Sequence, residues 1–195
     1  MISKKIIWPI FILVSLVQLF VPAIMIWERE DVLKTGTEYK FESRPVDPTD
    51  PFRGKYVVLN YTGSSVKVTD PDLWTRGEEV FALLSTDANG YARVDSLLRN
   101  KPKDGEPYLK TKIRFTTKVQ NTGTVTLDFH FDRLYMEESK AYPAEKIYVE
   151  SRRDASSTTY ALVNIKEGSA VLKDVMIDGE SINEIVKRKM LEEEG

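Results

Sequence analysis

The chain divides into one long apolar run and a longer region in which apolar and polar residues alternate. From Ile6 to Trp27 the sequence contains no charged residue. As a helix this run would be about 33 Å long, which is enough to cross the hydrocarbon core of a bilayer. The run is apolar on all sides, unlike an amphipathic helix that packs on a soluble core. It therefore predicts one transmembrane helix.

The charges that flank the apolar run predict its orientation. Lys4 and Lys5 precede the run, whereas the acidic segment "EREDV" follows it from Glu28. Because positive charge stays on the cytoplasmic side, we expect residues 1–5 in the cytoplasm, 6–27 in the membrane and 28–195 outside. A cleaved signal peptide is the alternative, but the run is longer than a typical signal core and has no small-x-small site before Ile24. The pattern favours an uncleaved, single-pass signal anchor in the cell membrane.

Beyond the anchor the hydrophobic period is close to two, which predicts strands. The segments with this period are 37–44, 55–61, 78–85, 91–98, 108–115, 124–131, 158–165 and 169–177. In the sixth of these, Val125, Leu127, Phe129 and Phe131 should face inward. The Asn89-Gly90 pair predicts a hairpin in which both residues supply positive φ. Short strands at short intervals predict a mainly β domain, an antiparallel barrel or sandwich.

Two further segments have patterns that are compatible with a helix. The C-terminal "SINEIVKRKMLEEE" predicts a short helix, because Ser181 and Glu184 form a capping box and Ile182, Ile185 and Val186 share a face. The segment "PAEKIYVESRRD", residues 143–154, fits a helix or a strand, and both interpretations stay open.

Composition excludes some classes of function. The chain has 28 basic and 30 acidic residues and a formal net charge of -2, so it lacks the basic surface of a nucleic-acid-binding protein. It has no cysteine, which excludes disulfides, thiolate metal ligands and a cysteine nucleophile.

The segment "RPVDPTDPFRGK", which we call the elbow, joins the first two predicted strands. Its three prolines fix φ and hold the preceding residues extended, so the loop is ordered in advance. Asp47 and Asp50 can each pair with Arg44 or Arg53, and Gly54 allows a tight entry into the next strand. The elbow is either a structural corner locked by Asp–Arg pairs or a surface that contacts a ligand or partner.

The elbow and the strand after it resemble the signature of the GDYXXLXY protein family of bacterial membrane-anchored proteins. Gly54, Tyr56, Leu59 and Tyr61 occupy the named positions, and Lys55 replaces the aspartate. This replacement argues against a catalytic or metal-binding role for that position and favours a surface site at a strand edge.

The resemblance extends more loosely through "DANG", through "FDRLYMEE" with Tyr135 and Glu138, and through the segment 161–180. It implies an N-terminal anchor, a domain facing the periplasm or another part of the cell envelope, and a relation to a multi-span membrane protein. It implies no particular reaction.

Other candidate chemistry rests on few residues. His130 alternates with inward-facing residues, which predicts a surface histidine, with a metal or acid–base role as the alternative. Glu137, Glu138 and Glu145 follow it, but their spacing alone does not show that they converge on a cation. Ser64 and Ser65 with Lys67 faintly resemble the serine and lysine of bacterial signal peptidases, without the serine-x-methionine setting of that family.

We therefore predict a non-enzymatic binding or assembly module that works with a membrane or envelope partner and uses no cofactor. Its contact residues would be those of the elbow and motif, together with the tyrosines Tyr56, Tyr135 and Tyr142. We assign no catalytic residue and no metal site. The alternative is a metal-dependent or serine-type hydrolase of the envelope that uses Asp47, Asp50, His130 and Glu138.

Overall fold

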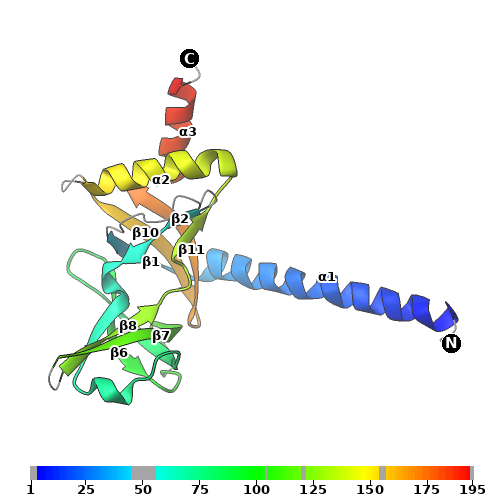
Figure 1. Ribbon diagram of the computed structural model, residues 1–195, viewed down its shortest axis with the longest axis horizontal. Coiled ribbons are helices and arrows are strands. Elements are labelled where there is room, and N and C mark those ends of the chain that lie inside the picture. Colours follow the sequence, from blue (N-terminus) through cyan, green and yellow to red (C-terminus); the bar gives the residue numbers. More distant parts are fainter. Residues whose placement is uncertain (1–3, 45–55, 104, 120–121, 154–156, 194–195) are drawn as a thin grey trace.

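A long N-terminal helix projects away from a β-rich domain (Figure 1). The structure, a computed structural model, describes residues 4–44, 56–103, 105–119, 122–153 and 157–193. Helix α1 spans Lys4–Thr35 and continues through Pro9 and Pro22. The apolar run is thus helical as predicted, and the helix extends beyond Trp27. Within the described chain, α1 alone is long and apolar enough to cross a membrane, from Trp8 to Thr35.

Five strands form a nearly closed antiparallel barrel in the order β4-β8-β7-β5-β6. They are β4 (Ser65–Val68), β5 (Glu79–Thr86), β6 (Ala92–Leu98), β7 (Tyr108–Val119) and β8 (Thr122–Asp128). The edge strand β6 also contacts β4, which nearly closes the barrel. Side chains alternate as predicted, because Val80, Ala82 and Leu84 of β5 are buried between half-exposed neighbours. The expectation of an antiparallel barrel or sandwich is confirmed.

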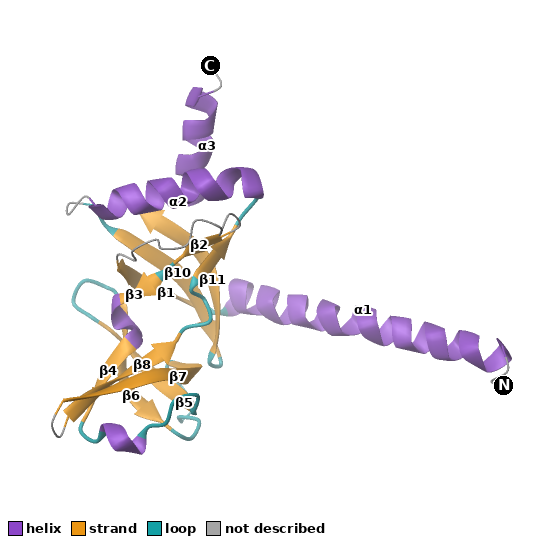
Figure 2. Cartoon of the chain, viewed as in Figure 1, coloured by secondary structure: helices purple, strands orange, loops and turns teal. Residues whose placement is uncertain are grey.

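A second sheet has the order β12-β11-β10-β1-β3, and β2 pairs with β9 in a separate ribbon (Figure 2). The strands are β1 (Thr37–Arg44), β2 (Tyr56–Val58), β3 (Asn60–Tyr61), β9 (Arg133–Tyr135), β10 (Thr159–Lys166), β11 (Ser169–Ile177) and β12 (Glu180–Ser181). Two short 3₁₀ turns, Thr62–Ser64 and Pro71–Leu73, flank β4. The predicted strand 55–61 is therefore split between the ribbon and the second sheet.

Two helices pack beside the second sheet and the ribbon. The open alternative at 143–154 is resolved as a helix, because α2 spans Glu138–Arg153. The predicted C-terminal helix is α3, Ile182–Glu193, and its inward face of Ile182, Ile185 and Val186 is buried as expected. Ser181 caps this helix, since its hydroxyl accepts the N–H of Asn183 at 3.2 Å.

The barrel, the second sheet and the helices share one hydrophobic core. Four aromatic rings meet where the two sheets join: Phe41 of β1, Tyr61 of β3, and Phe129 and Phe131 in the segment after β8. Their ring centroids lie between 4.9 and 5.9 Å apart. The inward orientation predicted for Val125, Leu127, Phe129 and Phe131 is confirmed.

The turn between β5 and β6 corrects one prediction. The hairpin forms, but only Gly90 has a positive φ, at 85°, and Asn89 does not. The reason is the turn type: the Gly90 N–H donates to the Asp87 carbonyl at 3.0 Å, and the Asp87 carboxylate accepts the N–H groups of Asn89 and Tyr91. A type I turn followed by one left-handed residue needs glycine only at its end.

Candidate functional site

The family-like motif lies where the chain passes from the ribbon to the second sheet. Val57, Leu59 and Tyr61 are buried, whereas the residues between them point outward. The Leu59 N–H donates to the Asp132 carbonyl at 2.8 Å. This bond lies between the pairing of β2 with β9 and the pairing of β3 with β1. Leu59 therefore occupies a core position at the crossing between two sheets.

Tyr61 has the most constrained side chain of the motif. Its ring belongs to the aromatic group at the sheet junction, and its hydroxyl donates to the Phe131 carbonyl at 2.8 Å. Burial raises the pKa of Tyr61 well above its usual range, so the hydroxyl stays protonated and remains a donor. The motif residues Leu59 and Tyr61 are thus core residues of the fold.

Tyr56 lies on the opposite side of the same stretch and forms an outward-facing group with Tyr135 and Arg133. The two tyrosine rings are 5.5 Å apart between centroids, and the Arg133 guanidinium lies 5.0 Å from the Tyr56 ring centroid. Hydrogen bonding to Tyr135 and the charge of Asp132 raise the pKa of Arg133. Tyr135 is 68% exposed. We call Tyr56, Arg133 and Tyr135 the tyrosine patch.

The elbow itself falls outside the part of the chain that the structure describes. This applies to the candidates Asp47, Asp50, Arg53 and Gly54. Both interpretations of the elbow, structural corner and contact surface, therefore stay predictions. Tyr56 follows the elbow in the chain, so the tyrosine patch begins where the elbow ends.

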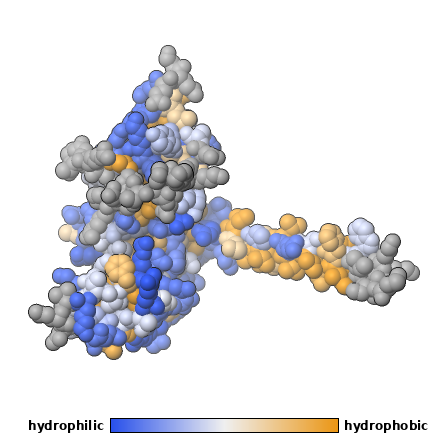
Figure 3. All heavy atoms as spheres, in the orientation of Figure 1, coloured by the Kyte–Doolittle hydropathy of each residue, from blue (hydrophilic) through white to orange (hydrophobic). Residues whose placement is uncertain are grey.

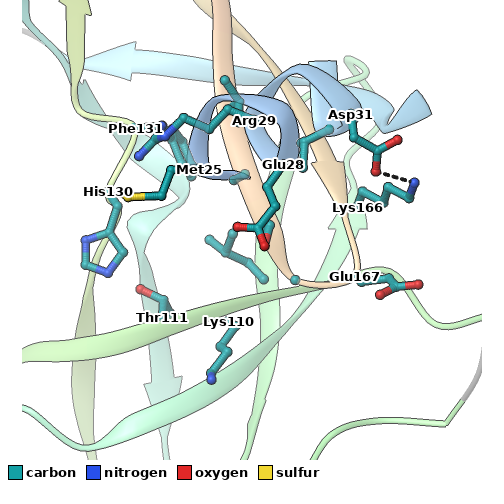
Figure 4. A pocket seen from close by; sticks show the side chains of 16 residues that line it. Met25, Glu28, Arg29, Asp31, Lys110, Thr111, His130, Phe131, Lys166 and Glu167 are labelled. Carbon is teal, nitrogen blue, oxygen red and sulfur yellow. Dashed lines mark hydrogen bonds and ion pairs between the residues drawn. The ribbon is translucent and has the colours of Figure 1, made fainter. Parts of the chain in front are cut away.

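His130 lies elsewhere, in a cleft of about 590 Å³ between the base of α1 and the β-domain (Figure 4). It is exposed, as predicted. Glu138 begins α2, and its side chain is outside the described part. Among the described residues no three His, Asp or Glu side chains are grouped closely enough to hold a metal ion.

The serines of the peptidase alternative make local hydrogen bonds. The Ser64 hydroxyl donates to the Tyr61 carbonyl at 2.9 Å, and the Ser65 hydroxyl bonds that of Thr126 at 3.0 Å. These are the bonds of a turn and of a cross-strand pair, as expected from serines in "TGSS".

The base of α1 is fixed to the second sheet by contacts that sequence reasoning missed. The Lys166 ammonium lies 2.6 Å from the Asp31 carboxylate, and the Asn164 amide donates to the Leu33 carbonyl at 2.7 Å. Val32 between them is buried. The hydrogen bond from Lys166 is the main reason that the pKa of Asp31 is lowered.

The chain leaves α1 through a tight contact at Gly36. A Cβ at this position would lie 2.5 Å from the Val32 carbonyl oxygen and 3.1 Å from that of Ile165. Both neighbours are backbone atoms, so a side chain here would force the helix away from β10. Glycine thus allows the helix and the strand to approach closely.

The family model of the GDYXXLXY protein matches residues 18–175, which is most of the chain. The chain belongs to the GDYXXLXY family. No curated protein and no solved structure shows a significant match. Within this family motif, Leu59 and Tyr61 are core residues and Tyr56 is the surface residue. Arg133, which completes the tyrosine patch, was missed because only its pairing across β2 and β9 brings it to Tyr56.

Proposed function

We propose that this GDYXXLXY family member is a single-pass, membrane-anchored binding or assembly module with its β-domain outside the cytoplasm. It works with a membrane or envelope partner and performs no reaction. The observation that carries this proposal is the continuity of α1, which extends without interruption from an exposed apolar segment to the contacts that fix the β-domain.

Exposure of the apolar side chains supports a membrane anchor. Along α1 nearly every described side chain before Asp31 is exposed, and Figure 3 shows the helix as a predominantly hydrophobic rod. Trp8 is 66% and Trp27 72% exposed. Such a surface is costly in water and favourable in lipid, and indole rings prefer the two membrane interfaces. Residues 6–27 are the proposed span, with the lysines before it in the cytoplasm.

The fixed base of α1 supports a docking role. Because α1 is not followed by a flexible linker, the β-domain is held at one height and orientation above the membrane. A domain held in this way presents the same face to a neighbour in the membrane at all times, which reduces the entropy lost on docking.

The tyrosine patch is the proposed contact surface, together with the elbow that precedes it. Tyrosine and arginine are among the residue types enriched where protein–protein binding energy is concentrated. Tyrosine buries a large area at a small cost in side-chain entropy, and the arginine fork donates several hydrogen bonds in a fixed geometry. The two tyrosine rings, tilted by 57° to each other, and the guanidinium over Tyr56 are already in contact in the free protein, so they are pre-ordered for binding.

The test is purification of the full-length protein from its own membranes in mild detergent. We expect a stoichiometric partner with the unchanged protein, at least tenfold less of it with Tyr135→Ala, and normal recovery with Phe115→Ala, an exposed aromatic of the barrel. Equal recovery with both variants would contradict the assignment of the patch. Absence of any stoichiometric partner would contradict the docking function.

Asp50→Ala in the same experiment addresses the elbow. Loss of the partner with unchanged thermal stability would make the elbow a contact surface. Loss of stability by a few kcal/mol, as expected when a buried arginine loses its partner, would make it a structural corner.

A further inference from the structure

The face of α1 that contacts the β-domain at the base of the helix can be followed into the apolar run. Val32 packs on the second sheet, and Met25 and Arg29 line the cleft below it. Gln18 lies about two turns before Met25, and Met25 lies about two turns before Val32, so the three side chains point to the same side. The face that is buried above the membrane therefore continues down into the proposed span.

Gln18 is the unusual residue of this face. Ser15 and Gln18 are the uncharged polar side chains between the two end tryptophans, and they lie one turn apart. The Gln18 side chain is exposed, and within the described chain nothing bonds to its amide. In hydrocarbon an amide without a partner is costly, and polar side chains in membrane helices commonly bond to a neighbouring helix.

The cleft lies at the outer end of the same face. Its other wall comes from β7, with Lys110 and Thr111, and from His130 (Figure 4). Among the described residues the Arg29 guanidinium has no ion-pair partner, whereas Asp31 is paired with Lys166. The cleft has a volume of about 590 Å³, and the turn that ends a membrane helix offers unpaired carbonyl acceptors to Arg29.

A second copy of the chain fits this face poorly. Its own α1 would continue as a helix to Thr35 and carry a second β-domain into the space under the first. A helix that ends at the membrane surface meets no such obstacle.

We propose that a membrane-spanning helix of a different protein packs along this face of α1. Its own polar side chain bonds to Gln18 within the bilayer, and its short extracytoplasmic turn occupies the cleft between α1 and the β-domain. The inference rests on the proposed function and names the kind of partner.

Photo-crosslinking from single cysteines tests this geometry, because the natural chain has no cysteine. Val14→Cys, which lies one turn before Gln18 on the same face and leaves Gln18 in place, and Lys110→Cys, each coupled to a thiol-reactive benzophenone, are irradiated in native membranes. Leu16→Cys is the control, since two residues turn the helix by about 200°. We expect the Val14 and Lys110 sites to crosslink to one other protein, in the middle and at the outer end of the same membrane segment. The Leu16 site should give at least tenfold less of this adduct.

The amount of co-purified partner shows whether the Gln18 amide forms a hydrogen bond with the partner or only lies close to it. Gln18→Leu should reduce the co-purified partner by about tenfold, and Gln18→Asn should retain most of it. The inference is overturned by an adduct to a second copy, by equal adducts from Leu16, or by no protein adduct at Val14. If the unchanged protein still recovers a stoichiometric partner, the docking function survives this failure. If it recovers none, the docking function fails as well.

Discussion

At the scale of single residues, Tyr61 shows why the motif is needed for folding. Its hydroxyl donates a hydrogen bond to the buried Phe131 carbonyl. Tyr61→Phe should therefore lower the free energy of unfolding by about 1–2 kcal/mol, and Tyr61→Ala by about 3–5 kcal/mol. Denaturant unfolding of the full-length protein in detergent measures both. Tyr135→Phe removes an exposed hydroxyl and is the control. Equal destabilisation by Tyr61→Phe and Tyr135→Phe would contradict the structural role of Tyr61.

Single residues also show the limit of prediction from sequence. The alternation around Leu127 and Phe129 predicts which side chains enter the core, because the pleat fixes orientation locally. The partners of Tyr61 and Tyr56 are not predictable in this way, since each depends on pairing with a segment about seventy residues away or more. Glu167, with a positive φ before Gly168, was missed because glutamate is not a typical residue of that turn.

At the scale of elements, the base of α1 depends on Lys166. Replacing it by methionine removes the ion pair with Asp31 and the bond to Thr35, and keeps the length of the side chain. We expect a few-fold faster hydrogen exchange of the backbone amides in residues 32–36. Lys173→Met, which removes an ion pair to Glu38 in the same sheet, should leave these amides unchanged. If both variants exchange alike, the ion pair does not hold the helix.

The same contact should depend on pH. The pKa of Asp31 is lowered in the folded protein from its ordinary value of 3.8, so the carboxylate form is the one that the fold stabilises. The contribution is present above pH 3.8 and is lost as the pH falls through the lower folded pKa. The difference in exchange between the unchanged protein and Lys166→Met should therefore vanish in strong acid. A difference in exchange that persists in strong acid would show that the Lys166 side chain acts through packing and not through its ion pair with Asp31.

At the scale of the whole molecule, the apolar run and the strand series could be predicted, because both are periodic patterns of neighbouring residues. The order of the strands could not. β1 pairs with β10, and β2 and β3 join different sheets although they are adjacent in the chain. The cleft at the base of α1 could not be predicted either, because its walls come from segments that are far apart in the sequence: α1, β7 and the β10–β11 hairpin.

The proposed function depends most on the placement of α1 in the membrane, and single-cysteine labelling tests this placement directly. Ser3→Cys and Ala88→Cys are compared in intact cells with a membrane-impermeant maleimide. This placement predicts that Ala88→Cys is labelled, that Ser3→Cys is labelled only after lysis, and that both proteins keep their full mass. Labelling of Ser3→Cys but not Ala88→Cys in intact cells, or a chain that has lost its apolar run, would contradict it.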